Sequence, residues 1–251
     1  MRRWFFLSSL FIVVLVGWLL YQAPAKLINQ YGAQHFPQLR LEELDGTLWQ
    51  GAAKRAYWQI GTSVLPLGKL YWRIDWQKLA QMQLSIQFYT EAEGYSFDGS
   101  LTAIDGGVRI EKGNGQFPLT LLEAWVPLLV SADVRLNLKQ MDYSYGRFTA
   151  LTGFLSADRV TWEVGDYDMP LGDYQADVAL LDDQLVLLIE DVKAALGADA
   201  EMRFSAEGSY QFNAVLSPRD HLAPEVARVI GWLGKREKNG QVIVSQQGRW
   251  Q

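Results

Sequence analysis

The hydrophobic positions of the chain form two patterns, one continuous and one alternating. The continuous pattern runs from residue 4 to residue 21 and contains no charged side chain. Eighteen residues at a rise of 1.5 Å per residue make a helix of about 27 Å, close to the hydrocarbon thickness of a bilayer. The pattern predicts a transmembrane anchor over residues 4–21. Its apolar and interfacial side chains include Trp4, Phe5, Phe11, Trp18 and Tyr21.

Basic residues predict how this anchor is oriented. Arg2 and Arg3 precede the apolar run, and the first basic residue after it is Lys26. Positive charge tends to stay on the cytoplasmic side of a membrane. We therefore expect residues 1–3 in the cytoplasm and the remainder of the chain exported.

The same run has two other interpretations. Ala23-Pro24-Ala25 fits the small-x-small pattern of a signal-peptide cleavage site. The apolar part of a signal peptide usually spans about 7–15 residues, which is shorter than this run and favours a retained anchor. A buried helix of a soluble domain is the third interpretation.

The alternating pattern begins at Leu39. Short segments rich in β-branched and aromatic residues are separated by Gly, Asp and Asn, and Trp72, Ile74 and Trp76 alternate with polar residues. Such alternation predicts antiparallel strands with one buried face. The predicted strands span residues 69–76, 83–89, 95–103, 108–111, 133–138, 159–164, 174–180, 185–189, 200–207, 210–216 and 241–245.

Helical spacing interrupts the strands and suggests how the chain is divided. We expect a helical linker over 22–38, a connecting helix over 118–130 and a helix over 223–233. The connecting helix separates a first β half, 39–117, from a second β half, 131–251. Each helix is expected to cap the end of a sheet, with partner binding as the alternative.

A weak internal repeat supports two related halves. Trp58, Gly61, Pro66, Leu67 and Gly68 recur as Trp162, Gly165, Pro170, Leu171 and Gly172, at a constant offset of 104 residues. The predicted fold is therefore mainly β. It consists of one N-terminal transmembrane helix followed by an extended, curved antiparallel sheet from two tandem meander-like halves, with a few short capping helices.

Composition narrows the function classes. Ten Trp residues and an apolar fraction of 49% can fill a substantial core. The net charge of −5, without a basic stripe, argues against nucleic acid as a partner. The chain has no Cys, so disulfides, thiolate metal sites and a Cys nucleophile are excluded.

The residues that carry chemistry form no recognisable site. His35 and His221 are far apart and lack a metal-binding spacing. Gly106-Gly107 and Gly113-Asn114-Gly115 are interpreted as hairpin turns. We predict no catalytic residue, cofactor or metal. Acidic residues that are expected to be solvated turn positions, rather than a glycosidase pair or a calcium site, are Asp166, Asp168, Asp173, Asp177, Asp182, Asp183, Glu190 and Asp191.

Three segments resemble a known family. The first contains Gly46, Thr47, Trp49 and Gly51 in the order Gly-Thr-x-Trp-x-Gly. The others are a Leu-Gly-x-Leu-x-Trp segment and a C-terminal arrangement of Pro-Arg, a helix and Gly-x-Trp. In this order they resemble protein N of the type II secretion system, also called general secretion pathway protein N. The remaining matching residues are Leu67, Gly68, Trp72, Pro218 and Arg219.

The resemblance implies a bacterial inner-membrane protein with a periplasmic domain that helps to export folded proteins across the outer membrane. It implies other secretion-system proteins as partners and no catalytic activity. The second half lacks the Gly-Thr-x-Trp-x-Gly segment, so a role of the first copy is not transferred to it.

A structural role is expected for the first motif. Gly46 and Gly51 permit bends or close backbone approach. Leu48 and Gln50 are expected on one strand face and Trp49 on the other.

Two other functions remain open at this stage. A membrane-anchored groove for lipid binding or transfer is the alternative, because an open apolar groove could hold a lipid chain. An enzyme ranks last, since no residues suited to activating water, a nucleophile or a proton donor are recognised.

Overall fold

The computed structural model describes residues 11–12, 14–15, 17–19, 21–30, 37–60, 63–122, 130–164, 167–219, 222 and 224–249. The described chain is mainly antiparallel β with a few short helices, which confirms the predicted class. The strands are β1 Leu39–Gly46, β2 Gln50–Ile60, β3 Ser63–Ile74, β4 Ser85–Ala92, β5 Tyr95–Ile104, β6 Gly107–Pro118, β7 Val130–Ser144, β8 Arg147–Val164, β9 Tyr167–Leu181, β10 Gln184–Ala194, β11 Leu196–Ser205, β12 Ser209–Pro218, β13 Lys235–Arg236 and β14 Val242–Arg249.

Strand order follows the sequence almost throughout. The fourteen strands of the sheet are ordered β1 to β12, then β14 and β13. Successive strands therefore pair as antiparallel neighbours, as in a meander. Two compact units divide the chain, Met1–Ser96 and Phe97–Gln251, whereas the sequence favoured a division at 118–130.

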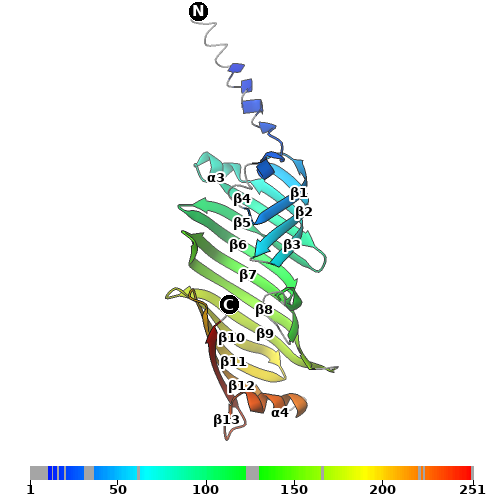
Figure 1. Ribbon diagram of the computed structural model, residues 1–251, viewed down its shortest axis with the longest axis vertical. Helices are drawn as coiled ribbons and strands as arrows, with labels where there is room; N and C mark the ends of the chain where they lie inside the picture. Colours follow the sequence, from blue (N-terminus) through cyan, green and yellow to red (C-terminus); the bar gives the residue numbers. More distant parts are fainter. Residues whose placement is uncertain are drawn as a thin grey trace, which may run out of the picture. The chain divides into compact units, whose positions relative to one another are not determined.

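The first unit builds its core on strands β1 to β3, which run side by side in Figure 1. Its buried apolar residues come from these strands and from the segment that precedes them. Trp72 and Ile74 are buried, in agreement with the predicted alternation, whereas Trp76, the third residue of the predicted set, is 49% exposed. The members of this core are Ala25, Leu41, Ala53, Ala56 and Trp72.

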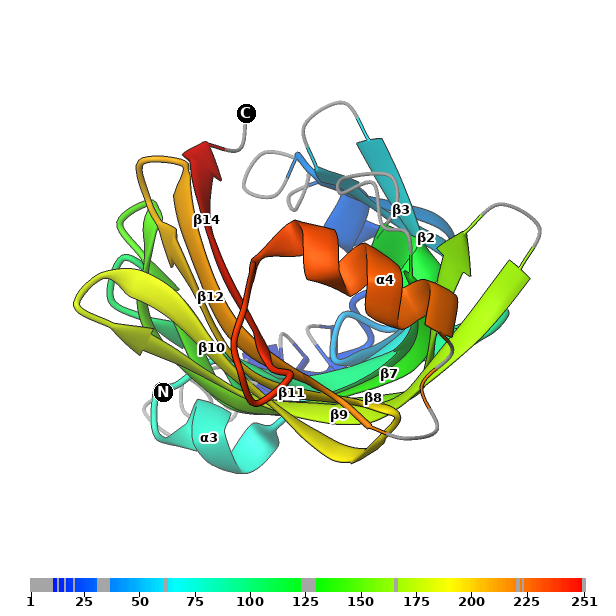
Figure 2. The same ribbon diagram turned by 90° about the horizontal axis from the view of Figure 1, so that it is seen from below.

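The second unit has its own core beneath helix α4, Pro224–Leu233. Val226 and Ile230 of α4 are almost completely buried and pack against Val242 and Val244 of β14. Figure 2 shows α4 against the strands of this unit. The expected helix over 223–233 thus has its apolar stripe on the sheet, and Pro224 occupies the first helical position.

The α-helix expected over 118–130 is absent at every position of this segment that the structure describes. Pro118 ends β6, Leu119–Leu122 form a 3₁₀ helix (η1), and Val130 opens β7. Pairing of Pro118 with Asp133 extends the β6–β7 hairpin into the region where helical spacing had suggested a helix. Residues 123–129, including Trp125, lie outside the described residues.

The linker expected over 22–38 is helical at residues 27–30, and residues 31–36 are not described. A short helix that the sequence interpretation missed is α3, Trp76–Ala80. Asp75 caps its N-terminus because its Oδ1 accepts hydrogen bonds from the N–H groups of Gln77 and Lys78, at 2.9 and 3.3 Å. The strand expected over 69–76 therefore stops at Ile74.

One predicted turn is a strand instead. Gly113-Asn114-Gly115 lies inside β6 and pairs with Leu138, Asn137 and Leu136 of β7. A Cβ on Gly115 would lie 2.8 Å from the ring of Phe97, so close packing accounts for this glycine. The predicted turn at Gly106 is confirmed, with φ of +66°.

The apolar N-terminal run is described only in part. Residues 11, 12, 14, 15, 17–19 and 21 are helical, and the structure has, in the part it describes, no helix of the length and apolar character that a membrane span requires. Side chains of the described helical residues are exposed, among them Phe11, Trp18 and Tyr21. The predicted positions Arg2, Arg3, Trp4 and Phe5 lie outside the described residues.

Candidate functional site

The Gly-Thr-x-Trp-x-Gly segment forms the turn between β1 and β2. Thr47 closes this turn, because its N–H donates to the carbonyl of Gln50 at 2.9 Å and its Oγ1 accepts from the N–H of Gln50 at 3.2 Å. The expected strand faces for Leu48, Trp49 and Gln50 are therefore wrong, since residues 47–49 are not in a strand. Gly46 and Gly51 pair directly at the base of the turn.

Both glycines of this turn are required by geometry. Gly46 has φ of +87°, a conformation that side chains with a Cβ rarely adopt. A Cβ on Gly51 would lie 2.5 Å from Cζ2 of Trp72 and 2.6 Å from the carbonyl oxygen of Asp45. Gly51 thus lets the turn approach Trp72 of β3.

Trp72 fixes the turn from β3. Its indole N–H donates to the carbonyl of Leu48 at 3.1 Å, and the N–H of Ile74 donates to the carbonyl of Trp49 at 2.8 Å. The ring of Trp49 lies against that of Trp76, with centroids 4.6 Å apart. The two tryptophans of the family motifs therefore hold one turn together.

The turn binds the segment that follows the apolar run. Pro24 forms an isolated antiparallel bridge with Thr47. On either side, the N–H of Ala25 donates to Gly46 at 3.1 Å and the N–H of Leu48 donates to Ala23 at 2.8 Å. Ala25 is only 1% exposed. We call this arrangement of residues 23–25 and 46–48 the N-terminal clasp.

The clasp shows what the sequence interpretation missed. Residues 23–25 had stood out only as a potential cleavage site, yet their backbone completes the first unit. The small side chain of Ala25 is the signal that could have been used, because a larger one would not fit among Leu41, Ala53 and Ala56.

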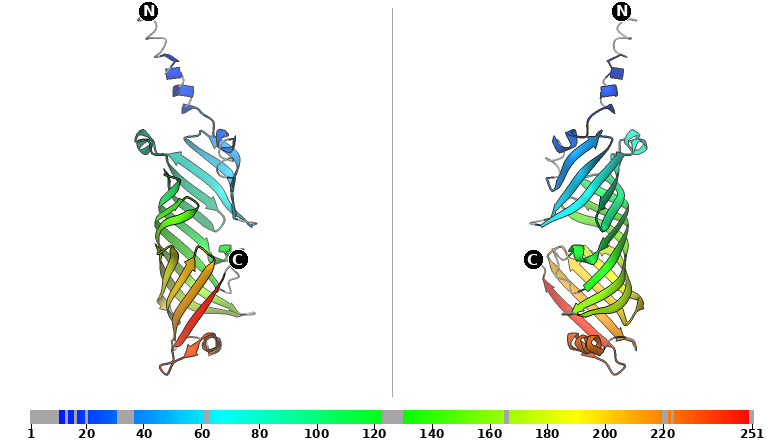
Figure 3. Two further views of the ribbon diagram at one scale, coloured as in Figure 1. Left: turned by 60° about the vertical axis from the view of Figure 1, so that its left-hand side comes forward. Right: turned by 90° about the vertical axis from the view of Figure 1, so that its right-hand side faces the viewer.

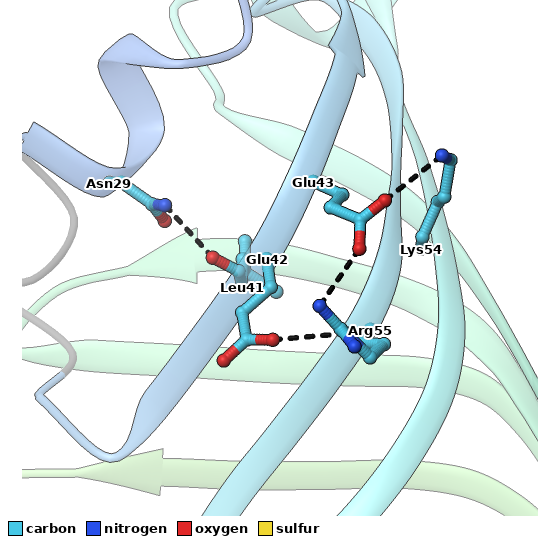
Figure 4. Close-up of polar contacts among 6 residues, drawn as sticks. All are labelled: Asn29, Leu41, Glu42, Glu43, Lys54 and Arg55. Carbon is cyan, nitrogen blue, oxygen red and sulfur yellow. Dashed lines mark hydrogen bonds and ion pairs between the residues drawn. The ribbon is translucent and has the colours of Figure 1, made fainter.

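A second contact ties the same N-terminal segment to β1. Nδ2 of Asn29 donates to the carbonyl of Leu41 at 2.9 Å. Together with the bond from Ala25 to Gly46, this contact occupies part of the outer edge of β1. Figure 4 shows Asn29 pointing to Leu41.

A charged cluster joins β1 and β2 beside this edge. Glu43 accepts from Lys54 at 2.9 Å and from Arg55 at 2.8 Å, and Arg55 also pairs with Glu42 at 3.0 Å (Figure 4). The hydrogen bond from Lys54 and the charges of Lys54 and Arg55 lower the pKa of Glu43. All four side chains are exposed, so the cluster is a solvated surface feature with a small effect on stability.

Leu67 and Gly68, the second family motif, lie where the β2–β3 pairing is irregular. Ala53 pairs with Leu70 and Ala56 with Gly68, so the register shifts at Lys54 and Arg55, as in a β-bulge. Gly68 has φ of +71°, and a Cβ there would lie 2.1 Å from the carbonyl oxygen of Glu91 in β4. The glycine therefore allows a kinked strand to stay close to its next neighbour.

The same irregularity recurs in the β8–β9 hairpin. Ala157 pairs with Tyr174, Val160 with Gly172 and Thr161 with Pro170. Each of these residues lies 104 positions after its counterpart in the β2–β3 hairpin. The predicted repeat thus has the same strand register and the same β-bulges in both copies.

Pro218 and Arg219, the third family motif, hold the end of the second unit. Pro218 ends β12, and Arg219 donates from Nη2 to Asp191 at 2.6 Å and from Nη1 to the carbonyl of Ala194 at 2.9 Å. Asp191 also accepts from the N–H of Ala198 at 3.0 Å. Arg219 therefore stabilises the β10–β11 connection.

Tyr174 lies in the same neighbourhood. Its hydroxyl donates to the carbonyl of Leu196 at 2.7 Å. Burial raises the pKa of Tyr174, the charge of Asp191 raises it further, and Arg219 acts in the opposite direction. The phenol stays neutral and serves as a structural hydrogen-bond donor.

The acidic residues that the sequence grouped together have separate positions. Asp182 and Asp183 form the β9–β10 turn, as expected, and Asp173 accepts from the N–H of Arg159 at 2.8 Å. The turn expectation is wrong for the residues that lie within β9 and β10, namely Asp168, Asp173, Asp177, Glu190 and Asp191. Asp166, His35 and His221 lie outside the described residues. Among the residues that are described, no group of three or more acidic or His side chains could hold a metal ion.

Comparisons with known proteins agree with the resemblance of the three motifs. A relative from Aeromonas hydrophila is 23% identical over 274 residues, covering 99% of this chain and 100% of the relative, and is named type II secretion system protein N. Relatives of the same name from Vibrio cholerae serotype O1 and Klebsiella pneumoniae are 24% and 23% identical. These two cover 84% and 97% of this chain, and 85% and 95% of their own lengths. No solved structure matches the chain.

A family model described as type II secretion system (T2SS), protein N, matches residues 37–245, which contain the first two motifs and, of the third, Pro218, Arg219 and the helix. Membership supports a role in type II secretion and interaction with other secretion-system proteins. The chain belongs to the type II secretion system protein N family.

Proposed function

We propose that this protein is a non-catalytic component of the type II secretion machinery. Its N-terminal helix holds it in the bacterial inner membrane, and its β units act in the periplasm through contacts with other proteins of the machinery. In this way it contributes to the export of folded proteins across the outer membrane.

The N-terminal clasp is the observation that carries the anchored part of the proposal. Residues 23–25 are separated from the apolar run by Gln22 alone, and their backbone pairs with the turn of a family motif. A helix continued by such a segment is tied to the first unit, without a free linker. When two proteins are anchored in the same membrane, their effective concentration for each other rises, so weak contacts can suffice.

Exposed apolar side chains support membrane insertion of the preceding helix. Phe11, Val14, Trp18 and Leu19 are each more than half exposed. Apolar side chains on all sides of a helix are favourable in hydrocarbon and costly in water. Arg2 and Arg3 favour a cytoplasmic N-terminus.

Ionisable groups whose pKa values are shifted make contacts between strands, which supports a non-catalytic role. The pKa of Asp142 is lowered mainly by its hydrogen bond with Arg109, which donates to both carboxylate oxygens at 2.8 and 2.7 Å. The shifted pKa values of Glu43 and Tyr174 likewise accompany contacts between strands. These groups stabilise the sheet.

The proposal is tested by crosslinking in intact cells, followed by purification of the chain from solubilised membranes. We expect other type II secretion proteins among the crosslinked partners. Their absence, with the chain itself fully recovered, would overturn the proposed mode of action. The intact mass of the membrane-extracted chain tests the anchor separately, since a cleaved signal would remove the N-terminal residues.

The pocket that the structure describes in the second unit does not favour lipid binding. A pocket of about 460 Å³ in the second unit is lined largely by polar side chains, including Arg203, Gln211 and Gln247. Such a lining does not favour an acyl chain. Native mass spectrometry of the extracted protein tests lipid binding directly, and bound lipid would support it as a second function.

A further inference from the structure

The outer edge of β14 lacks a strand partner over most of its length. β13 pairs only with Val242 and Ile243, so within the described chain no strand pairs with residues 245–249 on that side. Figure 3 shows β14, in red, at the margin of the strands of the second unit. An edge of this kind can pair with another polypeptide.

Hydrogen bonding shows which backbone groups face outward. The N–H of Glu237 donates to the carbonyl of Gln241 at 2.8 Å, which places that carbonyl on the β13 side. Because backbone direction alternates along a strand, the N–H and C=O groups of Ser245, Gln247 and Arg249 face the same side. Three donors and three acceptors are thus available to an added strand.

The strand at the other end of the strand order, β1, has a partly covered outer edge. Ala25 and Asn29 donate to its carbonyls, and Glu43 interrupts its regular pairing with φ of +53°. Covering groups and irregular backbone are devices that protect an edge. Residues 245–249 of β14 show neither Pro, Lys nor positive φ.

The polar pocket lies beside this edge. Arg203 pairs with Gln211 and Gln211 with Gln247, while Ser209 pairs with Arg249. Residues two apart on a strand share a face, so these side chains lie on one face of β11, β12 and β14. The pocket reaches from this face to Arg249 at the free edge.

Charge in the pocket favours an anionic group. Arg203 donates to Glu201, whereas Arg249 has no ion-pair partner in the described part of the chain. The hydroxyls of Ser205 and Ser209, 2.7 Å apart, line the same pocket. Guanidinium and hydroxyl donors together suit a carboxylate.

We infer that β14 is a docking strand for an extended acidic segment of a protein partner. The segment pairs with the backbone of Ser245, Gln247 and Arg249 and places a carboxylate in the pocket between Arg203 and Arg249. The inference rests on the proposed function only in taking the partner to be a protein.

Binding of a synthetic peptide tests the inference without any secretion protein. The probe is a fluorescent peptide, Thr-Glu-Val-Glu-Val-Glu-Thr, compared with the same peptide carrying Lys for Glu, on the full chain in detergent. We expect the acidic peptide to bind at least about tenfold more tightly by anisotropy. Gln247→Pro should weaken it about tenfold, because it removes an outward N–H and leaves the β12 pairing intact.

Two matched variants separate backbone and charge. Gln247→Ala keeps the N–H, so it should weaken binding of the acidic peptide clearly less than Gln247→Pro does. Arg249→Gln should weaken binding about tenfold, whereas Arg228→Gln, exposed on α4, should not. Equal binding of the acidic and basic peptides, or no effect of both Gln247→Pro and Arg249→Gln, would overturn the inference and leave the proposed function standing.

Discussion

Gly51 illustrates how much of the first unit depends on one absent side chain. The turn of the N-terminal clasp can approach Trp72 only because no Cβ stands between them. The sequence predicted that Gly46 and Gly51 serve backbone geometry. It could not predict that the space is occupied by Trp72, because that contact depends on the register of β2 and β3.

Adding a methyl group at this position should therefore be costly. We expect Gly51→Ala to lower the free energy of unfolding by about 2 kcal/mol, through overpacking against Trp72 and Asp45. Gly231→Ala is the matched control, since no atom lies within 4 Å of a Cβ there and the residue is helical. Urea unfolding should show the control to be stabilised by about 0.5–1 kcal/mol; equal effects of the two changes would refute the packing argument.

The buried carboxylate of Asp142 gives a pH-dependent test. Its folded-state pKa is lowered by Arg109, so the pair stabilises the fold above the unfolded pKa of about 3.9 and loses this effect as pH falls through the folded value. We expect Asp142→Asn to cost about 2 kcal/mol at neutral pH. The difference from the unmodified chain should shrink below about pH 4.

Arg135→Gln provides the comparison for this ion pair. Arg135 pairs with Asp158, and both side chains are more exposed than Asp142. The change should cost under about 1 kcal/mol at neutral pH. A loss as large as that of Asp142→Asn would show that burial does not determine how much each ion pair contributes to the free energy of unfolding.

Elements were predicted better than their ends. Most strands were expected in the correct places but too short, because alternation is visible only where one face is buried. The β8 strand extends over Arg147–Val164, whereas only residues 159–164 were predicted. Gly153 accounts for part of the difference, since it reads as a turn residue yet packs against Leu138 within the sheet.

The repeated hairpins show which features of the elements could be predicted from the sequence. Trp, Pro, Leu and Gly at an offset of 104 predicted a repeat, and the two copies have matching bulges. The segments that complete their cores differ, however. Ala25 and Ile28 pack in the first unit, and Val226 and Ile230 of α4 pack in the second. These come from opposite ends of the chain, so no repeat could reveal them.

Helix α4 should be held by its buried face alone. Ile230 is 1% exposed, and Ile230→Ala should lower the free energy of unfolding by about 2–5 kcal/mol. Trp232 on the same helix is 78% exposed, so Trp232→Ala should change it by less than about 0.5 kcal/mol. Urea unfolding of both variants checks this expectation, and a larger loss for Trp232→Ala would contradict the assigned orientation.

At the scale of the whole molecule, the N-terminal clasp joins the proposed membrane helix to the first unit. The membrane assignment is a prediction from the sequence, and charge within the helix tests it. We expect Leu15→Arg with Leu19→Arg to remove the chain from carbonate-washed membranes, because a charge near the helix centre, as at residue 15, costs about 2.5–3.5 kcal/mol on insertion and the charge at residue 19 adds a smaller cost nearer the helix end. Val64→Arg, at an exposed position of β3, should remain in the membrane fraction. Equal retention of all variants would exclude this helix as the anchor.

Sequence also limits what could be said of function at this scale. The motifs identified the family because their order is specific, even though each contributes to the fold: Gly46 to a turn, Trp72 to the clasp and Arg219 to a strand connection. A binding surface such as the free edge of β14 leaves no motif, since its donors and acceptors are backbone groups common to all residues.

Whether the chain acts in export is measured by the release of secreted enzymes from cells that lack it. We predict that the enzymes accumulate inside the deletion strain as folded, active proteins, and that expression of the unmodified chain restores their appearance in the medium. The Leu15→Arg, Leu19→Arg variant should fail to restore release at equal abundance, whereas Val64→Arg should succeed. Normal release by the deletion strain would show that the chain is not needed for export.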